Sequence, residues 1–335
     1  MRLMKRMLQC AFALGLLAVV SGAQAQGEPS TSSGQGFPNK PIKLVVPYAP
    51  GGLPDTMSRI IAQRMSESMD QQVVVENRPS AGGIVGCEVV AKSPADGYTL
   101  LVADVGQVAI NPALYSKLPY DPVKDFVPVS LIGTSTLFLA AHSSVPANSL
   151  EELIKLAKAK PGLLNYGSSG TGSIHHLATE VLKADLGLDI VHVPYKGTGQ
   201  TIPALLGGQV ALAYSALPSI AAQIKSGGVK VLAASTAKRS PQMPDVPTVA
   251  EVTGIRDYDF APEIGVLAPA GTPKPIVDKL AAEIAKAAKN PDTVQRYTTL
   301  GIDPVGSTPE AYAAVIHASI DKYAKAVKIS GAKID

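Results

Sequence analysis

Short apolar runs that suit β-strands alternate along this chain with segments whose apolar residues recur every three or four positions. Ile42–Val46 (IKLVV) is rich in β-branched residues, which favours a buried strand. After a break at residues 48–55, Met57, Ile60 and Ile61 follow with helical spacing. The alternation continues to the C-terminus, and it predicts an α/β fold with parallel sheets that helices cover on both faces.

The remaining predicted elements follow the same two patterns. Further strands are predicted at residues 73–75, 98–103, 165–166, 190–193, 210–214, 229–233 and 264–267. Further helices are predicted at residues 83–92, 150–159, from 174 onward, 275–289 and 309–327. The chain has 335 residues, of which 46% are hydrophobic and 17% charged, so it can fill about two domain cores and is not a disordered chain.

The N-terminus has the three parts of a secretory signal peptide. Arg2, Lys5 and Arg6 precede an apolar run at residues 11–20, and Ala-Gln-Ala at 23–25 forms the cleavage site. We therefore expect residues 1–25 to be removed, residues 26–36 to be a flexible leader, and the protein to be exported, which in the family named below means a periplasmic location. Without these three of its 30 basic residues, the chain has 27 basic and 27 acidic side chains, a balance that argues against nucleic-acid binding.

Cysteine usage excludes a disulfide in the mature chain. Cys10 leaves with the signal peptide, so Cys87 remains alone. Cys87 is interpreted as a small buried apolar residue, because a reactive thiol would need a neighbouring His or Lys that the sequence does not offer. No later segment approaches the roughly 18 apolar residues of a membrane span.

The loop at residues 167–173 (GSSGTGS) lies between a predicted strand and a predicted helix. Its hydroxyls and backbone N–H groups gather at a helix N-terminus, which stabilises an anion. Ser173 stands where a nucleotide-binding P-loop has lysine, and neither the dinucleotide fingerprint nor the nucleophile elbow fits. Two interpretations stay open: a site for a small carboxylate, or a plain turn that Ser173 caps.

The loop at residues 48–55 also follows a strand and precedes a helix. Gly51 and Gly52 let backbone approach a ligand closely, and Asp55 is placed either to contact that ligand or only to cap the helix. Both loops follow the carboxyl end of a strand, which is where open α/β sheets bind ligands. Tyr195 and Lys196, after the strand at 190–193, are placed to serve a carboxylate, although Lys196 also suits a solvated loop.

The histidines do not predict a metal site or a hydrolase. Adjacent His175 and His176 point about 100° apart on a helix, so they cannot chelate one ion as an i, i+4 pair can. His176 is expected to pack or bond near the loop. No metal and no cofactor is predicted.

Read together, these segments resemble the solute receptors of tripartite tricarboxylate transporters, the Bug proteins. The matching stretches are FPNKPIKLVVPYAPGG..D, VVVENRPSAGG, DGYTLL, NPALY..LPYDPVKDFVPVS, LNYGSSGTGS..H, VHVPYKG, LLGGQV and APAGTP, in that order. The resemblance implies a type II periplasmic-binding-protein fold, with two α/β lobes and the ligand cleft between them. It also implies a small carboxylate ligand, membrane subunits of a transporter as partners, and no catalysis; we expect a monomer.

We expect lobe 1 at residues 37–134 plus 260–335 and lobe 2 at residues 135–259, because the second anion loop lies mid-chain and the long C-terminal helices are left to cover the first sheet. The resemblance implies the ligand-binding residues, which are Tyr48, Gly51, Gly52 and Asp55 in lobe 1, and Ser168, Thr171, Gly172, Ser173 and Tyr195 in lobe 2. The chain departs from the family pattern at Leu53, Pro54, Ser215 and Glu263, which bears on ligand identity. Two other functions stay open: an exported hydrolase or isomerase, and a ligand-sensing accessory to a membrane sensor kinase.

Overall fold

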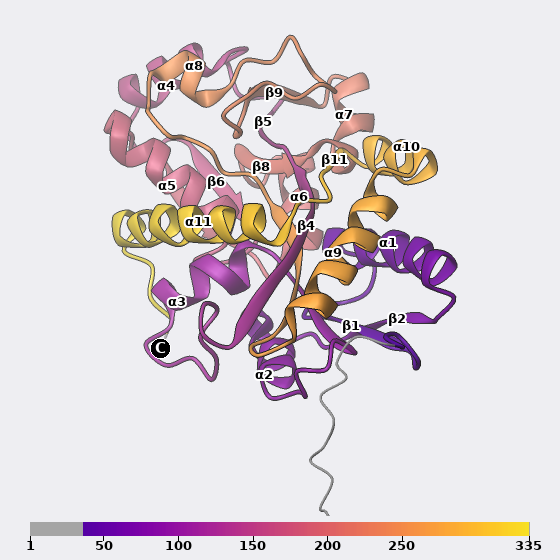
Figure 1. The fold of residues 1–335 in the computed structure, drawn as a ribbon. Helices are drawn as coiled ribbons and strands as arrows, with labels where there is room; N and C mark the ends of the chain where they lie inside the picture. Colours follow the sequence, from indigo (N-terminus) through magenta and orange to yellow (C-terminus); the bar gives the residue numbers. More distant parts are fainter. Residues whose placement is uncertain (1–35, 335) are drawn as a thin grey trace, which may run out of the picture. The chain divides into compact units, whose positions relative to one another are not determined.

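The computed structural model describes residues 36–334, and within them the strands gather in two sheets (Figure 1). In order across the first sheet, the strands are β11 (Ile302–Pro304), β4 (Phe126–Ser135), β10 (Glu263–Pro269), β3 (Thr99–Ala103), β1 (Ile42–Val46) and β2 (Val73–Asn77). The second sheet has the order β7 (Val191–Pro194), β6 (Asn165–Ser168), β8 (Leu212–Ala216), β5 (Leu137–His142) and β9 (Val229–Ala234). The predicted signal peptide and nearly all of the predicted leader lie outside the described residues.

The sheets are mixed, so the prediction of parallel sheets is only half right. Strand β1 pairs in parallel with β2 and β3, and β6 pairs in parallel with β7 and β8. Strand β10, however, runs antiparallel to both β3 and β4, and β5 runs antiparallel to β8 and β9. Both antiparallel strands come from parts of the chain distant from their neighbours, and local sequence patterns carry no information about such pairing.

Side chains of the first sheet alternate between two cores, as the period of a strand requires. On β3, Leu100 and Val102 face one core, while Leu101 and Ala103 face the other. The first core is covered by helices α1 (Leu53–Met69), α9 (Lys274–Ala288) and α10 (Pro291–Thr299). The second is covered by α2 (Ile84–Ala91), the π-helical turn η2 (Gly106–Ile110), α3 (Asn111–Leu114) and α11 (Pro309–Ser330). In Figure 1, α9 (orange) and α11 (yellow) accordingly lie on opposite sides of β4.

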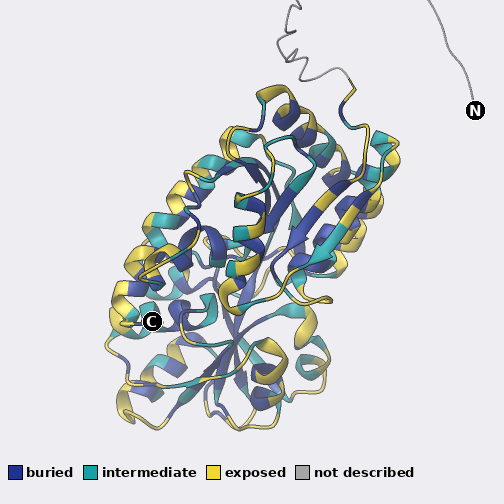
Figure 2. Ribbon diagram, turned by 90° about the horizontal axis from the view of Figure 1, so that it is seen from below, coloured by how far each residue is buried: buried dark blue, intermediate teal, exposed yellow. Residues whose placement is uncertain are grey.

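The second sheet is also covered on both faces. Helices α4 (Leu150–Ala159), α5 (Ile174–Leu186) and α8 (Val249–Thr253) pack on one face. The other face is covered by α6 (Thr198–Leu206) and α7 (Ala221–Lys225), and the short turn η3 (Leu217–Ser219) leads into α7. Another short turn, η1 (Ala81–Gly83), leads into α2. Figure 2 shows the result: buried residues line the strands, and exposed residues lie on the outer helix surfaces.

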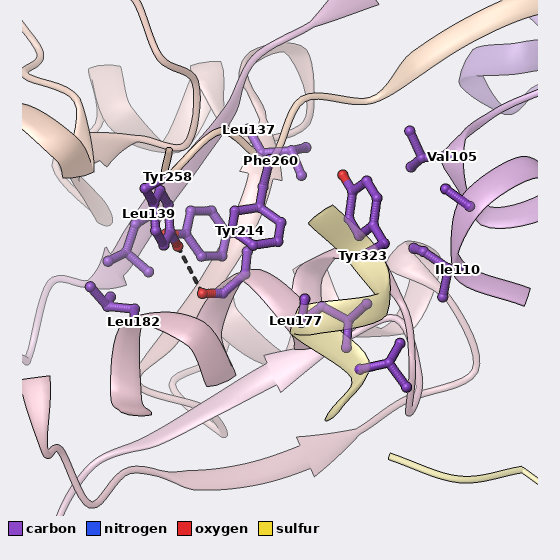
Figure 3. Packing of buried hydrophobic residues seen from close by; sticks show 14 of the residues in the cluster. Val105, Ile110, Leu137, Leu139, Leu177, Leu182, Tyr214, Tyr258, Phe260 and Tyr323 are labelled. Atoms are coloured by element: carbon purple, nitrogen blue, oxygen red, sulfur yellow. Dashed lines mark hydrogen bonds between the residues drawn. The ribbon is translucent and has the colours of Figure 1, made fainter. Parts of the chain in front are cut away.

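One apolar cluster continues from the first sheet to the second through α11. Figure 3 shows the aromatic residues of this cluster. Phe260 lies between Tyr258 and Tyr323, and Tyr323 belongs to α11. The Tyr214 and Tyr258 hydroxyls are 2.6 Å apart, and the Tyr258 hydroxyl also donates to the carbonyl oxygen of Ala178 at 2.8 Å. These bonds satisfy polar atoms that burial would otherwise leave costly.

The two sheets draw on different parts of the chain. The first uses strands from residues 42–135 and 263–304, and the second uses strands from residues 137–234. The finer division, with residues 37–134 and 260–335 in one lobe and 135–259 in the other, stays a prediction. Within the described residues, no helix combines the length and the apolar character needed to cross a membrane.

Candidate functional site

The loop that follows β6 is a turn closed by a helix cap. Ser173 is the N-cap of α5, and its Oγ accepts a hydrogen bond from the His176 backbone N–H at 3.3 Å. The Ser173 N–H donates to the carbonyl oxygen of Gly170 at 3.1 Å. Gly170 and Gly172 have φ values of 124° and 78°, which glycine adopts without strain. The predicted cap is therefore confirmed, and it brings the positive end of the α5 dipole to this loop.

Two of the predicted donors in this loop already have partners inside the protein. Ser168 is fully buried, and its Oγ lies 2.6 Å from His192 Nε2 and accepts a bond from the Gly170 N–H at 3.1 Å. The Gly172 N–H donates to His176 Nδ1 at 3.1 Å, so His176 bonds the loop as the sequence predicts. Ser168 and Gly172 thus shape the loop from within.

The groups that remain available to a ligand lie further out. Thr171 is exposed, and among the described residues neither its hydroxyl nor that of Tyr195 has a hydrogen-bond partner. The Ser173 hydroxyl accepts the cap bond and keeps its proton free within the same set of residues. The Tyr195 backbone N–H donates to the carbonyl oxygen of Ser168 at 3.0 Å, which holds Tyr195 beside the loop. Three hydroxyl donors in the loops after β6 and β7 are therefore free to bond a ligand, and one of them caps a helix N-terminus, which favours an anion.

Three stacked aromatic rings pack beside this loop. His192 stacks between Tyr166 and His176, with ring centroids 4.8 and 4.1 Å apart. Burial, together with the neighbouring His176, lowers the pKa of His192 to about 4. Burial also lowers the pKa of His176. Both imidazoles are consequently neutral at pH 7, which suits the acceptor role of His176 Nδ1.

In the loop that follows β1, Asp55 binds the protein itself. The Asp55 side chain is only 3% exposed, and its Oδ2 accepts from the Gly51 N–H at 2.9 Å and from Arg59 Nε at 3.0 Å. Its Oδ1 accepts from Asn77 Nδ2 and lies 2.9 Å from an Arg59 terminal nitrogen. These bonds outweigh burial and lower the pKa of Asp55. Asp55 fixes the backbone at Gly51 and, in this arrangement, has no oxygen left unpartnered for a ligand.

Asn77, at the end of β2, was not predicted as a site residue. Its Nδ2 donates to the carbonyl oxygen of Tyr48 at 3.1 Å as well as to Asp55, and its Oδ1 accepts from Arg59 at 2.9 Å. Asn77 therefore ties the β1 loop to the next strand. The sequence could have indicated Asn77, because this polar residue stands at the carboxyl end of a strand, the position that was used to select the two predicted loops.

Asp104 and Gln107 are further residues that the sequence reasoning missed. The Tyr48 hydroxyl donates to Asp104 Oδ2 at 2.7 Å and accepts from Gln107 Nε2 at 2.9 Å. Burial, and then the Asp104 carboxylate, raise the pKa of Tyr48 well above its usual value, and burial raises that of Asp104. Asp104 directly follows β3, so the rule that selected the other two loops applies to it as well.

The predicted ligand residues form two groups, one in the loop after β1 and the other in the loops after β6 and β7. One close contact links the second group to α3, which packs on the first sheet. A Cβ on Gly172 would lie 2.3 Å from Leu114 Cδ2 in α3, so the β6 loop packs closely against that helix. No hydrogen bond joins the two groups within residues 36–334. Gly52 is the exposed N-cap of α1, with no side-chain cap bond.

Ser215 and Glu263, two of the residues that depart from the family pattern, both form hydrogen bonds within the protein. The Ser215 hydroxyl donates to the carbonyl oxygen of Ala216 at 3.1 Å, and Ser215 is 2% exposed. The Ser319 hydroxyl donates to Glu263 Oε2 at 2.7 Å, and burial raises the pKa of Glu263.

A surface hollow of about 560 Å³ between Pro112, Tyr115 and Ile320 contains none of the predicted ligand residues. Across residues 36–334, no group of three His, Cys, Asp or Glu side chains is placed to hold a metal ion.

Cys87 is expected not to react with thiol reagents in the folded protein. It is fully buried, and burial raises its pKa to about 12, so almost no thiolate exists at pH 8. Mass spectrometry after treatment with iodoacetamide at pH 8 should find the mature protein unmodified in buffer and singly modified in 6 M guanidinium chloride. Rapid labelling of the folded protein would contradict the buried position.

Sequence comparison places this chain among transport receptors. A family model described as tripartite tricarboxylate transporter family receptor matches residues 57–331. The chain is 35% identical to Protein BugT of Bordetella pertussis over 322 residues, which cover 96% of this chain and 97% of BugT.

Solved structures give the same result. The chain resembles Rpa4515 of R. palustris, solved with adipate, at 36% identity and a TM-score of 0.79, covering 89% of this chain and all of that one. It also resembles MatC from Rhodopseudomonas palustris, solved with bound malate, at 33% identity and a TM-score of 0.74, covering 87% of this chain and all of that one. The predicted two-lobed fold of the periplasmic binding proteins is thereby confirmed.

Proposed function

The chain belongs to the tripartite tricarboxylate transporter receptor family, and on this basis we propose that it captures a small carboxylate-containing metabolite for a transporter of that type. The ligand would lie between the β1 loop and the β6 loop, and the membrane subunits of the transporter would receive it. The predicted signal peptide supports a periplasmic location for the mature protein. As a receptor, the protein would release its ligand chemically unchanged.

The observation that supports a carboxylate most directly is the set of free donors at the α5 N-terminus. The Ser173 hydroxyl caps the positive end of the 13-residue helix α5, which favours an anion, and the hydroxyls of Thr171 and Tyr195 in the adjoining loops have no partner among the described residues. No arginine or lysine lies in either loop, and Arg59 is occupied by Asp55. Neutral hydrogen-bond donors would therefore supply most of the stabilisation, as they do at other sites for small anions.

Solved relatives support the same ligand chemistry. Rpa4515 was solved with adipate, and MatC was solved with malate, both of which are small carboxylates. The β6 loop of this chain, residues 167–173, has a hydroxyl-rich composition at which a carboxylate group would bind. The ligands of these two relatives support a small carboxylate as the class of ligand. Which carboxylate this chain binds depends on the side chains of its own site.

Replacing Thr171 with valine or Ser173 with alanine is expected to weaken binding. Each change removes one hydrogen bond to a charged group, which corresponds to about 1–3 kcal/mol of binding free energy. A thermal-shift screen of small carboxylates would select a ligand, and isothermal titration calorimetry would compare its affinity for the variants with that for the wild-type protein.

The matched control is Ser149→Ala, because Ser149 is the N-cap of α4 in the same way that Ser173 caps α5. Its Oγ accepts from the Glu152 N–H at 3.2 Å. Losing either cap should lower the free energy of unfolding by about 1 kcal/mol. Only the Ser173 variant should also lose affinity. Unchanged affinity in both Thr171→Val and Ser173→Ala would mean that the β6 loop is a plain turn.

A further inference from the structure

The lobe 1 side of the proposed site carries a carboxylate that has no cationic partner. Asp104 follows β3, which pairs directly with β1, so the residues after these two strands meet at one edge of the sheet. Asp104 Oδ2 accepts from the Tyr48 hydroxyl at 2.7 Å, and Oδ1 accepts from the Gly106 N–H at 2.6 Å. Both oxygens act as acceptors, which suits an ionised carboxylate.

This bond uses the only proton of the Tyr48 hydroxyl. A phenol has a single O–H donor, and here it points at Asp104. Gln107 Nε2 donates to the same oxygen at 2.9 Å, and Gln107 is held in turn by the Asp104 N–H, which donates to its Oε1 at 3.0 Å. The orientation of the hydroxyl is therefore fixed from two sides. Tyr48 can accept a hydrogen bond from a ligand, but it has no proton to donate to a ligand carboxylate.

The contrast with Asp55 shows why Asp104 matters for selectivity. The charge of Asp55 is compensated by the two-pronged contact with Arg59. Within the described residues, Asp104 has no salt bridge and bonds only neutral groups. A ligand atom hydrogen-bonded to the Tyr48 oxygen would lie within about 6 Å of Asp104 Oδ2, because the Tyr48–Asp104 bond and one more hydrogen bond separate them. At that distance, in a partly buried site, like charges repel strongly.

We propose, building on the carboxylate-receptor function above, that Asp104 makes the lobe 1 end of the site reject a second carboxylate and favour a hydrogen-bond-donating end. The ligand class is then a monocarboxylate whose other end carries an ammonium, hydroxyl or amide group. The carboxylate binds at the β6 loop, and the donor end faces the Tyr48 oxygen. Asp104 acts through Tyr48 and through its charge, so it is a specificity-determining residue.

The test compares probes that differ only at one end. Isothermal titration calorimetry would measure the affinities of succinate against 4-aminobutanoate and of adipate against 6-aminohexanoate, so that two ligand lengths are covered. For at least one length, the wild-type protein should bind the amino acid about tenfold or more tighter than the diacid. Asp104→Asn removes the charge and frees the Tyr48 proton, so the diacid should gain about tenfold or more and the amino acid should lose affinity.

Two further variants separate the charge from other effects. Asp278→Asn makes the same change in net charge on the surface of α9, where Asp278 pairs with Lys274 at 2.7 Å, and it should leave the preference unchanged. Tyr48→Phe removes the hydroxyl and keeps the Asp104 charge, so it should still disfavour the diacids. The wild-type preference tests the proposal even where a variant fails to fold.

The outcomes distinguish this proposal from the receptor function on which it rests. If no carboxylate binds to the wild-type protein, the receptor function itself is contradicted. If the wild-type protein binds each diacid as tightly as or more tightly than the matching amino acid, the receptor function stands and the role of Asp104 is overturned; an unchanged preference in Asp104→Asn overturns it as well. Loss of the preference in Tyr48→Phe would also overturn it, because the hydroxyl and not the charge would then discriminate.

Discussion

Replacing Gly172 with alanine is expected to lower the free energy of unfolding by about 2–5 kcal/mol. Gly172 has a φ of 78°, where an L-residue pays about 1–2 kcal/mol. The new methyl group would also lie 2.3 Å from Leu114 Cδ2, and overpacking of this kind costs a further 1–3 kcal/mol or so. Urea denaturation followed by circular dichroism would measure the change. Ligand affinity should fall as well, because the β6 loop must move away from α3.

Gly187→Ala provides the matched control for this experiment. Gly187 ends α5 with a φ of 64°, and a Cβ there would meet no atom within 4 Å. Its substitution should therefore cost only the conformational part, about 1–2 kcal/mol. Leu114→Ala in the Gly172→Ala background should recover part of the contact energy. If Gly172→Ala is no more destabilising than Gly187→Ala, the packing of the β6 loop on α3 is wrong.

Acidification is expected to destabilise the protein through His192. Burial and the adjacent His176 lower its pKa from about 6.5 to about 4, so the unfolded chain takes up a proton before the folded protein does as the pH falls. The stability associated with neutral His192 is complete above about pH 6.5 and is lost as the pH approaches 4. One pKa unit corresponds to 1.36 kcal/mol, so His192 should account for about 3 kcal/mol over this interval.

Free energies of unfolding measured in urea between pH 7 and pH 4 would test this expectation. His192→Gln keeps a polar group near Ser168 but does not titrate, so its stability should fall by about 3 kcal/mol less than that of the wild type. His317→Gln removes an exposed histidine on α11 and should reproduce the wild-type pH profile. Nearby Glu180 and Lys183 pair with each other at 2.6 Å and are present in every variant. Identical profiles for His192→Gln and the wild type would contradict the buried neutral state of the ring.

Sequence patterns located most strands and helices because each of them buries one regular face. Strand β1 and helix α4 both span the predicted residues, 42–46 and 150–159. The patterns did not locate β4 or β5. Strand β4 contains Pro128 and Gly133, which interrupt a strand signal, and it tolerates Pro128 because β11 pairs only with residues 133–135. Such a tolerance depends on where the neighbouring strand ends, which the local sequence does not encode.

The candidate site was only partly predictable for a related reason. Residue type and position after a strand selected both loops correctly as turns between strand and helix. The i,i+4 spacing of Asp55 and Arg59 on α1 was available in the sequence, but the contacts of Asp55 with Asn77 and of Ser168 with His192 were not, because those partners come from other strands. Asp104 was missed although it also follows a strand, since a lone acidic residue near a predicted anion site has no obvious role until its bond to Tyr48 is seen.

The receptor function is tested most directly by calorimetric titration of the purified protein with a panel of small mono- and dicarboxylates, followed by mass spectrometry of the recovered ligand. We expect at least one carboxylate to bind with a stoichiometry of one and to be recovered with its mass unchanged after prolonged incubation. Thr171→Val and Ser173→Ala should weaken that same interaction. A recovered product of different mass would show that the protein is an enzyme, and absence of binding across the panel would contradict its assignment as a carboxylate receptor.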